Sequence, residues 1–471
     1  MIIIIILLYM TNIPNSPTYS CNNNEYIWII NNNGDNKVSQ LSITTGALIR
    51  TILVGITPSG ICIDAIYVWV SNQGDSTVSQ ILISSGQVVN TINLVTGTNA
   101  GNGLNPSSIC NDGDYIWTSN CGNNTLSHIL KSTASVVQTI SITGTNINLK
   151  GICSDGTNIW TTDFSNNVVY KNCYTGTYAS NIIYTLQVGS SPVGICTDGT
   201  YVWIANSFSN TISQILISSG LVTTIIVGQQ PFGICTDGTY VWVTNNTDNT
   251  VSQFLISSQK VINTLSVGQQ PYGIFDDGDY VWVCNNGDNT ISKIEIPFPP
   301  CFKKGTKILT DKGYKLIEDL RKGDLVKTIL NGYKPIFMIG KTDIHHPAYN
   351  NRNKNQLYKC SPSNYSEVFE DLVITGHHSI LVGAFDSNEQ REKTSKELGR
   401  IYITDYKYRL PACVDERASV YETPGNYTIY HLALENDNYY MNYGIYANGL
   451  LVETCSKRYL KELSNMELNH F

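Results

Sequence analysis

The sequence predicts an all-β protein: a seven-bladed β-propeller over residues 1–300, a second all-β domain over residues 301–455, and a short helical tail over residues 456–471. Three observations predict this: a sevenfold repeat, short strands with turn residues between them, and an abrupt change in charge. Residues 1–300 contain 7 Lys/Arg and 16 Asp/Glu, whereas the remaining 171 residues contain 23 and 21. The charged fraction rises from about 8% to about 26% near residue 300, which indicates a domain boundary.

The repeat is set by tryptophan. All seven Trp fall in one series with spacings of 39 to 48 residues, and other residue types keep register with it. Pro stands eleven residues before Trp in six of the seven units, Cys seven before it in six, Asp five before it in six, and Asn three after it in six. The series is Trp28, Trp69, Trp117, Trp160, Trp203, Trp242 and Trp282.

Each unit is predicted to form four short strands. In residues 231–270, runs of alternating β-branched and polar residues are separated by Asp-Gly, Asn-rich and Ser-Ser breaks, the pattern of strands joined by hairpin turns. Four strands in about 40 residues, repeated seven times, is typical of a seven-bladed propeller. The units resemble the YVTN-type propeller family, as in Tyr-Val-Trp-Val-Thr-Asn at 240–245 and the trailing Val267-Gly268. The resemblance covers nearly all of residues 16–297.

The two ends of the repeat complement each other. The last unit stops after its third strand, at Lys293–Ile296, and the first unit begins at Pro17. We therefore expect Ile2–Tyr9 to supply the missing outer strand of the last blade and close the ring. The alternative is that the apolar run Ile2–Leu8 belongs to a signal peptide, although no Lys or Arg precedes it.

The composition of the propeller favours binding over catalysis. It contains one His (His128) and two Glu (Glu25 and Glu295), too few for an acid–base site. The repeated Asp is interpreted as turn chemistry, and the repeated Cys as small apolar side chains. We expect an unknown protein or small-molecule ligand on the propeller.

Several functional classes are not expected. A net charge of −7 argues against nucleic acid, and no run reaches the roughly 18 apolar residues of a transmembrane helix. No cofactor or metal is predicted, because no CxxC pair appears and His345-His346 has no nearby Cys or carboxylate cluster. The localisation stays unknown, since a free thiol does not assign a compartment.

Three sequence blocks after residue 300 carry the candidate chemistry. They are Cys301–Val326 (Cys-Phe-x-x-Gly-Thr, Ile-Glu-Asp-Leu and Lys-Gly-Asp-x-Val), Leu372–Leu381 (with Thr-x-x-His) and Tyr430–Glu453. Together they resemble a Hint domain, the autoprocessing fold shared by hedgehog proteins and inteins. The resemblance spans about residues 301–455 and implies an all-β, horseshoe-like domain.

The resemblance implies that Cys301, Thr375 and His378 are the catalytic residues of a self-cleaving protein. The Cys301 thiol follows the Pro300 carbonyl, so it can attack intramolecularly and convert the Pro300–Cys301 amide into a thioester. We expect His378 to protonate the leaving nitrogen, and Thr375 to hold the scissile amide or to stabilise the oxyanion. This would be single-turnover autoprocessing.

Two further histidines are candidates for the site, one as an alternative general acid and one as a supporting residue. His377 is the rival general acid, but adjacent residues of a strand point to opposite faces, and the motif spacing favours His378. His431 lies in a strand-like run and is a candidate supporting residue. Pro300 stiffens the cleavage junction and would slow the acyl shift.

The end of the domain determines how the thioester is resolved. Inteins end in His-Asn followed by Cys, Ser or Thr, whereas this chain reads Val452-Glu453-Thr454-Cys455. This departure disfavours splicing, so we expect an outside nucleophile, most simply water, to resolve the thioester and release the propeller. Cys455 is either a second reactive thiol or a packing residue. The alternative function is a non-catalytic interaction or adhesion protein with a degenerate Hint domain.

Overall fold

The computed structural model describes residues 16–469 except 24, 33, 44, 96–103, 174–181, 278–279, 296–299 and 465. Contacts divide the described chain into two compact units, one ending at Glu295 and the other following it. The ring-closing strand predicted at Ile2–Tyr9 lies outside the described residues.

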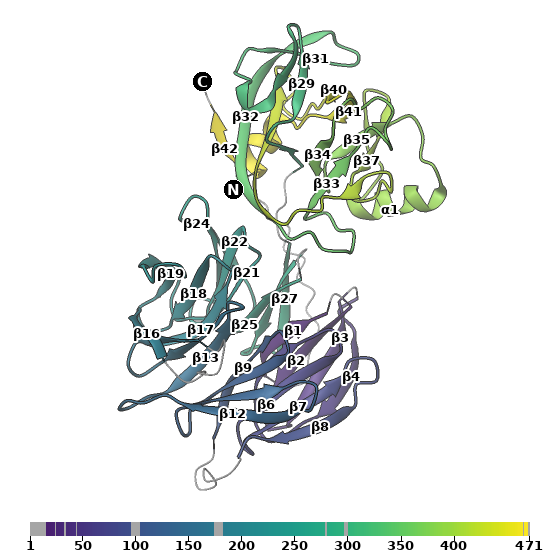
Figure 1. Ribbon diagram of the computed structural model, residues 1–471. Helices are drawn as coiled ribbons and strands as arrows, with labels where there is room; N and C mark the ends of the chain where they lie inside the picture. The colour runs from purple at the N-terminus through teal and green to yellow at the C-terminus, as the bar shows by residue number, and fades with distance from the viewer. Residues whose placement is uncertain are drawn as a thin grey trace. The chain divides into compact units, whose positions relative to one another are not determined.

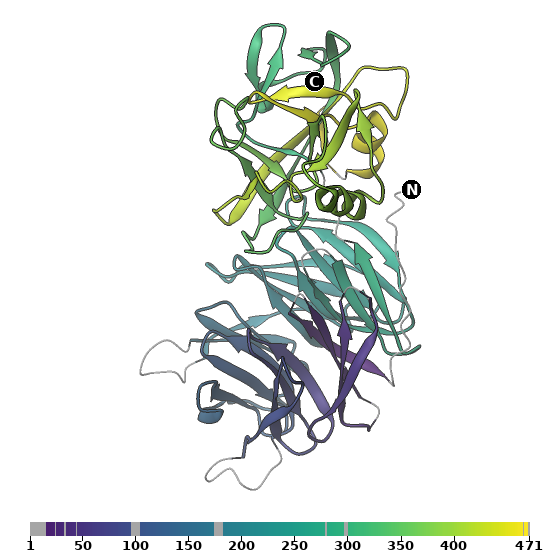
Figure 2. The ribbon, with the colours of Figure 1, turned by 90° about the vertical axis from the view of Figure 1, so that its right-hand side faces the viewer.

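The first unit is a seven-bladed β-propeller, as the repeat predicts (Figures 1 and 2). Six blades are four-stranded antiparallel sheets, and the described part of the seventh has three strands. The strands, blade by blade, are β1 (Pro17–Asn22), β2 (Tyr26–Asn31), β3 (Lys37–Ser42), β4 (Leu48–Leu53); β5 (Pro58–Ile63), β6 (Tyr67–Asn72), β7 (Thr77–Leu82), β8 (Val88–Asn93); β9 (Pro106–Asp112), β10 (Tyr115–Asn120), β11 (Thr125–Leu130), β12 (Ser135–Ser141); β13 (Leu149–Ser154), β14 (Asn158–Asp163), β15 (Val168–Cys173), β16 (Ile182–Gln187); β17 (Pro192–Thr197), β18 (Tyr201–Asn206), β19 (Thr211–Leu216), β20 (Val222–Ile226); β21 (Pro231–Thr236), β22 (Tyr240–Asn245), β23 (Thr250–Leu255), β24 (Lys260–Ser266); β25 (Pro271–Asp276), β26 (Tyr280–Asn285), β27 (Thr290–Glu295).

The inner strands form a closed ring. Each first strand of a blade packs on the first strand of the next, and β1 packs on β25. The Ser16 N–H donates to Asn289 Oδ1 at 2.6 Å, which repeats the bond from Thr57 N–H to Asn36 Oδ1 between the first two blades. The first and last blades are therefore joined by the same kind of bond as the first two.

The tryptophans form the core of the blades, and in five units the repeated Asp caps the turn before the Trp. In the unit of Trp242, Asp237 Oδ1 accepts the backbone N–H groups of Thr239 and Tyr240, which confirms the turn interpretation. The other carboxylate oxygen accepts Trp242 Nε1–H at 3.0 Å, a bond that the sequence analysis did not predict. The cross-strand partner of Trp242 is Gln253, which is also buried.

The second unit is built on an extended antiparallel sheet of fifteen strands. Its longest pairing joins β32 to β39, and β28 lies between β39 and β34. The strands are β28 (Phe302–Lys303), β29 (Lys307–Thr310), β30 (Gly313–Leu316), β31 (Leu325–Lys327), β32 (Tyr333–His346), β33 (Leu357–Cys360), β34 (Leu372–Thr375), β35 (Ser379–Val382), β36 (Ile403–Thr404), β37 (Lys407–Pro411), β38 (Ser419–Val420), β39 (Gly425–Leu434), β40 (Gly444–Ala447), β41 (Leu450–Glu453) and β42 (Glu467–Asn469).

Helical structure is limited in this unit. A 3₁₀ turn covers Ile317–Asp319, and helix α1 covers Asn388–Leu398. Helix α1 begins at Ser387, whose side chain accepts the Gln390 N–H, and it ends at Gly399 in the left-handed conformation.

The C-terminal tail differs from the predicted helix. A π-helical turn covers Tyr459–Leu463, but β42 comes after it and pairs with β32 through Ile339–Lys341. An exposed strand edge offers unpaired backbone groups that a following segment can satisfy. The tail therefore extends the sheet of the second unit.

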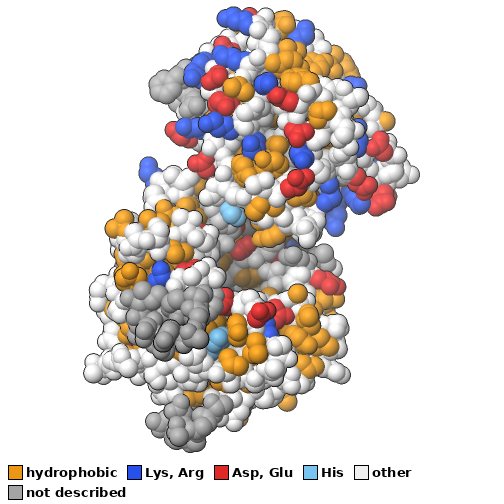
Figure 3. Space-filling view, in the orientation of Figure 1, with side chains coloured by type: hydrophobic (Ala, Val, Ile, Leu, Met, Phe, Trp, Pro, Cys, Tyr) orange, Lys and Arg blue, Asp and Glu red, His pale blue; other side chains and the backbone are white. Residues whose placement is uncertain are grey.

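Charge separates the two units as the composition indicates. Lys, Arg, Asp and Glu side chains are dense on the second unit and sparse on the propeller (Figure 3). In the part of the chain that the structure describes, no helix combines the length and apolar character needed to cross a bilayer.

Candidate functional site

The candidate site centres on Cys301, which immediately precedes β28. Phe302 pairs with Ile374 of β34 on one side and with Tyr430 of β39 on the other. Because the pairing with β34 is antiparallel, Cys301 lies opposite Thr375 at the end of that strand. The sheet therefore brings together two residues that are 74 positions apart in the sequence.

Thr375 holds the backbone of Cys301 through two hydrogen bonds. The Cys301 N–H donates to Thr375 Oγ1 at 2.7 Å, and the Thr375 N–H donates to the Cys301 carbonyl at 3.0 Å. Both residues are fully buried. The N–H held by the hydroxyl belongs to the Pro300–Cys301 peptide bond, so Thr375 fixes the orientation of that amide.

His378 lies in the turn between β34 and β35. Its N–H donates to the Thr375 carbonyl at 2.9 Å, and its own carbonyl accepts the Ala412 N–H. The imidazole packs against the Phe302 ring, with 4.2 Å between ring centroids. The Thr-x-x-His spacing therefore folds His378 back toward the segment that carries Cys301, although the described structure contains no hydrogen bond between His378 and Cys301.

His431 completes a group of three rings. It lies on β39, and its ring centroid is 5.2 Å from that of His378 and 5.6 Å from that of Phe302. His378 and His431 are each only 1% exposed. Sequence analysis predicted His431 as a supporting residue, and the structure places it beside His378.

Burial sets the protonation states of both histidines. Burial lowers the pKa of His378 to about 3, while the nearby backbone of Glu453 acts in the opposite direction. Burial and the neighbouring His378 hold the pKa of His431 well below its usual value. Neither ring nitrogen of His378 has a partner with hydrogen-bond geometry among the described residues. Both imidazoles are neutral at neutral pH.

The Cys301 thiol lies in a packed apolar cluster. Its Sγ lies 3.9 Å from Met466 Sδ, and the cluster also contains Met338, Cys455 and Leu460. Burial raises the pKa of Cys301 well above its usual value, and Cys455 adds to the effect. The Cys301 thiol is thus protonated at neutral pH. No motif pointed to Met466, because it immediately precedes the tail strand β42, far outside the three sequence blocks.

The residues at the end of the domain already have partners. The Glu453 carboxylate contacts Arg409 at 2.7 Å and accepts hydrogen bonds from Thr404 and Asn442. Thr454 Oγ1 accepts the Tyr443 N–H, and Cys455 Sγ donates to a backbone carbonyl in β39. Where inteins carry His-Asn, this chain carries two side chains that stabilise the fold.

The remaining histidine candidates lie elsewhere. His377 Nε2 lies 3.2 Å from Glu397 of α1, away from the Cys301 cluster. His345 contacts Asn426, and both ring nitrogens of His346 have backbone partners. No group of three or more metal-ligating side chains is found among the residues described.

Comparison with known proteins agrees with this geometry. The Hint domain family model matches residues 300–457. A solved structure, Kuenenia stuttgartiensis hydrazine synthase, matches with a TM-score of 0.51 and 14% identity, covering 61% of this chain and 97% of that one. At this identity the match shows the propeller fold alone. No curated protein sequence matches the chain.

The fold and the family match together define a two-part protein in which a propeller precedes a second all-β domain. The chain carries a seven-bladed β-propeller followed by a Hint domain.

Proposed function

We propose that this protein cleaves itself between Pro300 and Cys301 and releases a propeller that binds a protein or a small molecule. One observation carries the proposal: the amide nitrogen of this bond donates its proton to Thr375 Oγ1 at 2.7 Å. The threonine of the Thr-x-x-His motif thus holds the bond that is to break. The buried site also excludes competing water before the chemistry begins.

The acyl shift depends on the states of the two reacting side chains. A neutral His378 accepts a proton from the Cys301 thiol as Sγ attacks the Pro300 carbonyl carbon. The C–N bond then breaks, and the same proton passes from His378 to the leaving nitrogen, which becomes the α-amine of Cys301. His378 therefore acts as base and then as acid, and no external proton is consumed in this step.

Resolution of the thioester by water completes the cleavage. Water attacks the thioester carbon, the C–S bond breaks, and the Cys301 thiol is restored. The propeller leaves with a carboxylate at Pro300. The residues at 453 and 454 favour hydrolysis over splicing, because neither Glu453 nor Thr454 supplies a side-chain amide that could cyclise.

Reducing gel electrophoresis of the purified chain tests the proposal. Cleavage of the 52.1 kDa chain after residue 300 of 471 yields fragments of about 33 and 19 kDa, and added thiol speeds their appearance. Cys301→Ala abolishes both fragments, and Thr375→Val and His378→Gln slow cleavage by about 10²–10⁴-fold. Intact mass of the released propeller identifies the group that attacked the thioester.

Matched variants separate chemistry from folding. Cys360→Ala removes another fully buried cysteine of the same domain, and His377→Gln removes the adjacent histidine. Both should leave the cleavage rate within about threefold of wild type. Full-length protein after prolonged incubation with dithiothreitol would instead favour the non-catalytic interaction protein with a degenerate Hint domain.

A further inference from the structure

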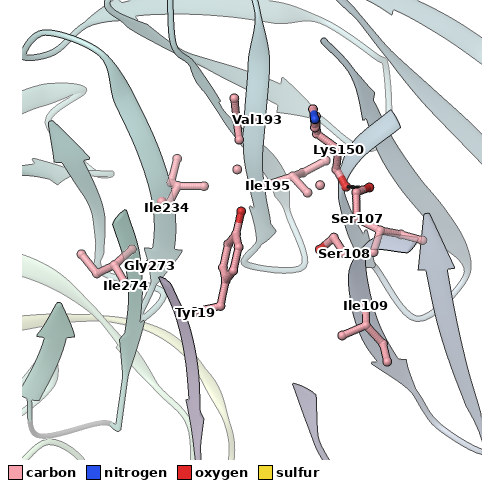
Figure 4. A pocket seen from close by; sticks show the side chains of 14 residues that line it. Tyr19, Ser107, Ser108, Ile109, Lys150, Val193, Ile195, Ile234, Gly273 and Ile274 are labelled. Carbon is pink, nitrogen blue, oxygen red and sulfur yellow. Dashed lines mark hydrogen bonds between the residues drawn. The ribbon is translucent and has the colours of Figure 1, made fainter. Parts of the chain in front are cut away.

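The propeller encloses a cavity on its axis. Its volume is about 170 Å³, and it is lined by the inner strands of six blades. Isoleucines from five blades supply most of its apolar wall, while Tyr19, Ser107, Ser108 and Lys150 supply polar atoms. Figure 4 shows the Tyr19 hydroxyl projecting into the middle of the cavity, toward the side where Val193 and Lys150 lie. No carboxylate belongs to this lining among the described residues.

The repeat itself shows that this cavity is asymmetric. Nine residues before each Trp, five units carry Gly, but the first carries Tyr19 and the third Ser108. At most of these sites a side chain cannot fit: a Cβ at Gly194 would lie 2.3 Å from the Phe232 carbonyl oxygen. Tyr19 and Ser108 are therefore the two positions of this layer where the ring presents a polar side chain to the axis.

Lys150 is the cation of the cavity. It stands at a position that carries Val193 in the next blade and Phe232 in the one after. Its side chain is half-buried, and its ammonium lies 5.9 Å from the Phe164 ring. Within the described ranges, this ammonium has no ion pair or hydrogen bond. By contrast, Lys131 of the same propeller lies 3.8 Å from Asp64.

An ammonium without a carboxylate partner attracts an anion. The cavity is smaller than the roughly 300–1,000 Å³ of sites for drug-sized ligands, so its ligand is small. The isoleucine wall suits a short hydrocarbon chain, and the charge on Lys150 suits an anionic group at one end of the same ligand.

We propose that the axial cavity binds a small aliphatic carboxylate, with its carboxylate on Lys150 and its carbon chain against the isoleucines. The inference deepens the proposed binding role of the propeller and rests on that role. It is independent of cleavage at Cys301.

Calorimetric titration of full-length Cys301→Ala protein with sodium butyrate tests this, at ionic strength held constant with sodium chloride. Butyramide has the same shape without the charge, so we expect it to bind at least about tenfold more weakly. The comparison of butyrate with butyramide needs no substitution in the propeller. Equal binding of the two probes, or no saturable binding of butyrate, would overturn the proposal.

Substitution at Lys150 tests the contact itself. Lys150→Gln should weaken butyrate binding at least about tenfold, whereas Lys260→Gln, which removes an exposed cation on outer strand β24, should not change it. Lys150→Arg keeps the charge and should retain binding. Unchanged affinity in folded Lys150→Gln protein would contradict the site. Butyrate binding by wild-type chain that stays uncleaved would refute the cleavage and leave this inference standing.

Discussion

Two buried histidines determine how the candidate site responds to acid. The folded-state pKa of His378 is about 3, against an ordinary value of 6.5. Between these values the unfolded chain binds a proton at His378 that the folded chain does not bind, so the free energy of unfolding falls as the pH drops below 6.5. The loss reaches about 1.4 kcal/mol per pH unit for this group, and stability is flat above 6.5. Hydrogen exchange of the amides in β34 and β39, followed from about pH 7.5 to about pH 4.5, measures it.

Two variants test this prediction: one replaces His378 itself, and the control replaces the adjacent His377. His378→Gln should reduce the pH dependence by the contribution of that group and leave the contribution of His431, whereas His377→Gln should keep the contribution of His378. His128 in the propeller, whose pKa burial lowers to about 4, is present in both variants. A pH dependence that is identical in wild type and His378→Gln would contradict the protonation states assigned here.

At the scale of single residues, the sequence predicts contacts between residues that lie close together along the chain. The proximity of Thr375 and His378 could be predicted because only two residues separate them and one turn joins them. Met466 could not, because its contact with Cys301 spans 165 positions and no motif marks it. The same holds for Arg409 and Glu453, whose ion pair joins β37 to β41.

Among elements, the turn between the first and second strands of a blade combines two functions. In five units the Asp accepts backbone N–H groups of the turn with one oxygen and Trp Nε1–H with the other. Composition alone predicted the first contact, since Asp-Gly is typical of turns. The second could have been inferred, because a constant five-residue spacing across a hairpin brings Asp and Trp together. The bonds to tryptophan measure 2.6–3.0 Å and join Asp64 to Trp69, Asp155 to Trp160, Asp198 to Trp203, Asp237 to Trp242 and Asp277 to Trp282.

Asp237→Ala tests how much this turn stabilises a blade. The change removes three hydrogen bonds and leaves the buried Trp242 N–H without its acceptor, so we expect a loss of about 2–3 kcal/mol. Asp248→Ala removes one exposed bond to the Gln229 N–H and should cost about 1 kcal/mol or less. Denaturant unfolding followed by tryptophan fluorescence reports on the propeller alone, because all seven Trp lie in it. Equal losses in the two variants would refute a special role for Asp237.

The propeller as a whole depends on how closely its inner strands approach. A Cβ at Gly194 would lie 2.3 Å from a neighbouring carbonyl oxygen, so Gly194→Ala forces two blades apart. We expect a loss of about 1–3 kcal/mol in the same fluorescence assay. Ser108 is the matched control, because it occupies the equivalent position in the third blade and already carries a Cβ. Ser108→Ala should change stability by less than about 0.5 kcal/mol, and an equal loss in both variants would contradict the close approach.

The architecture of the whole molecule could be predicted from the sequence because the two patterns that indicate it each extend over a whole domain. The tryptophan period predicted the number of blades, and the change in charge predicted two units. The tail was predicted less well: Glu467–Asn469 form a strand because β32 offers an edge to pair with, and that edge is a property of the folded sheet rather than of the segment.

The position of Phe302 has a consequence for the order of events after the acyl shift. Its backbone is paired on both sides and its ring is packed against two imidazoles. The newly formed amine of Cys301 would therefore stay anchored beside the thioester carbon from which it departed. In the mechanism proposed above, the first step would then be freely reversible. The yield of cleaved product would reflect a competition between the tethered amine, which restores the backbone, and a diffusing nucleophile, which resolves the thioester.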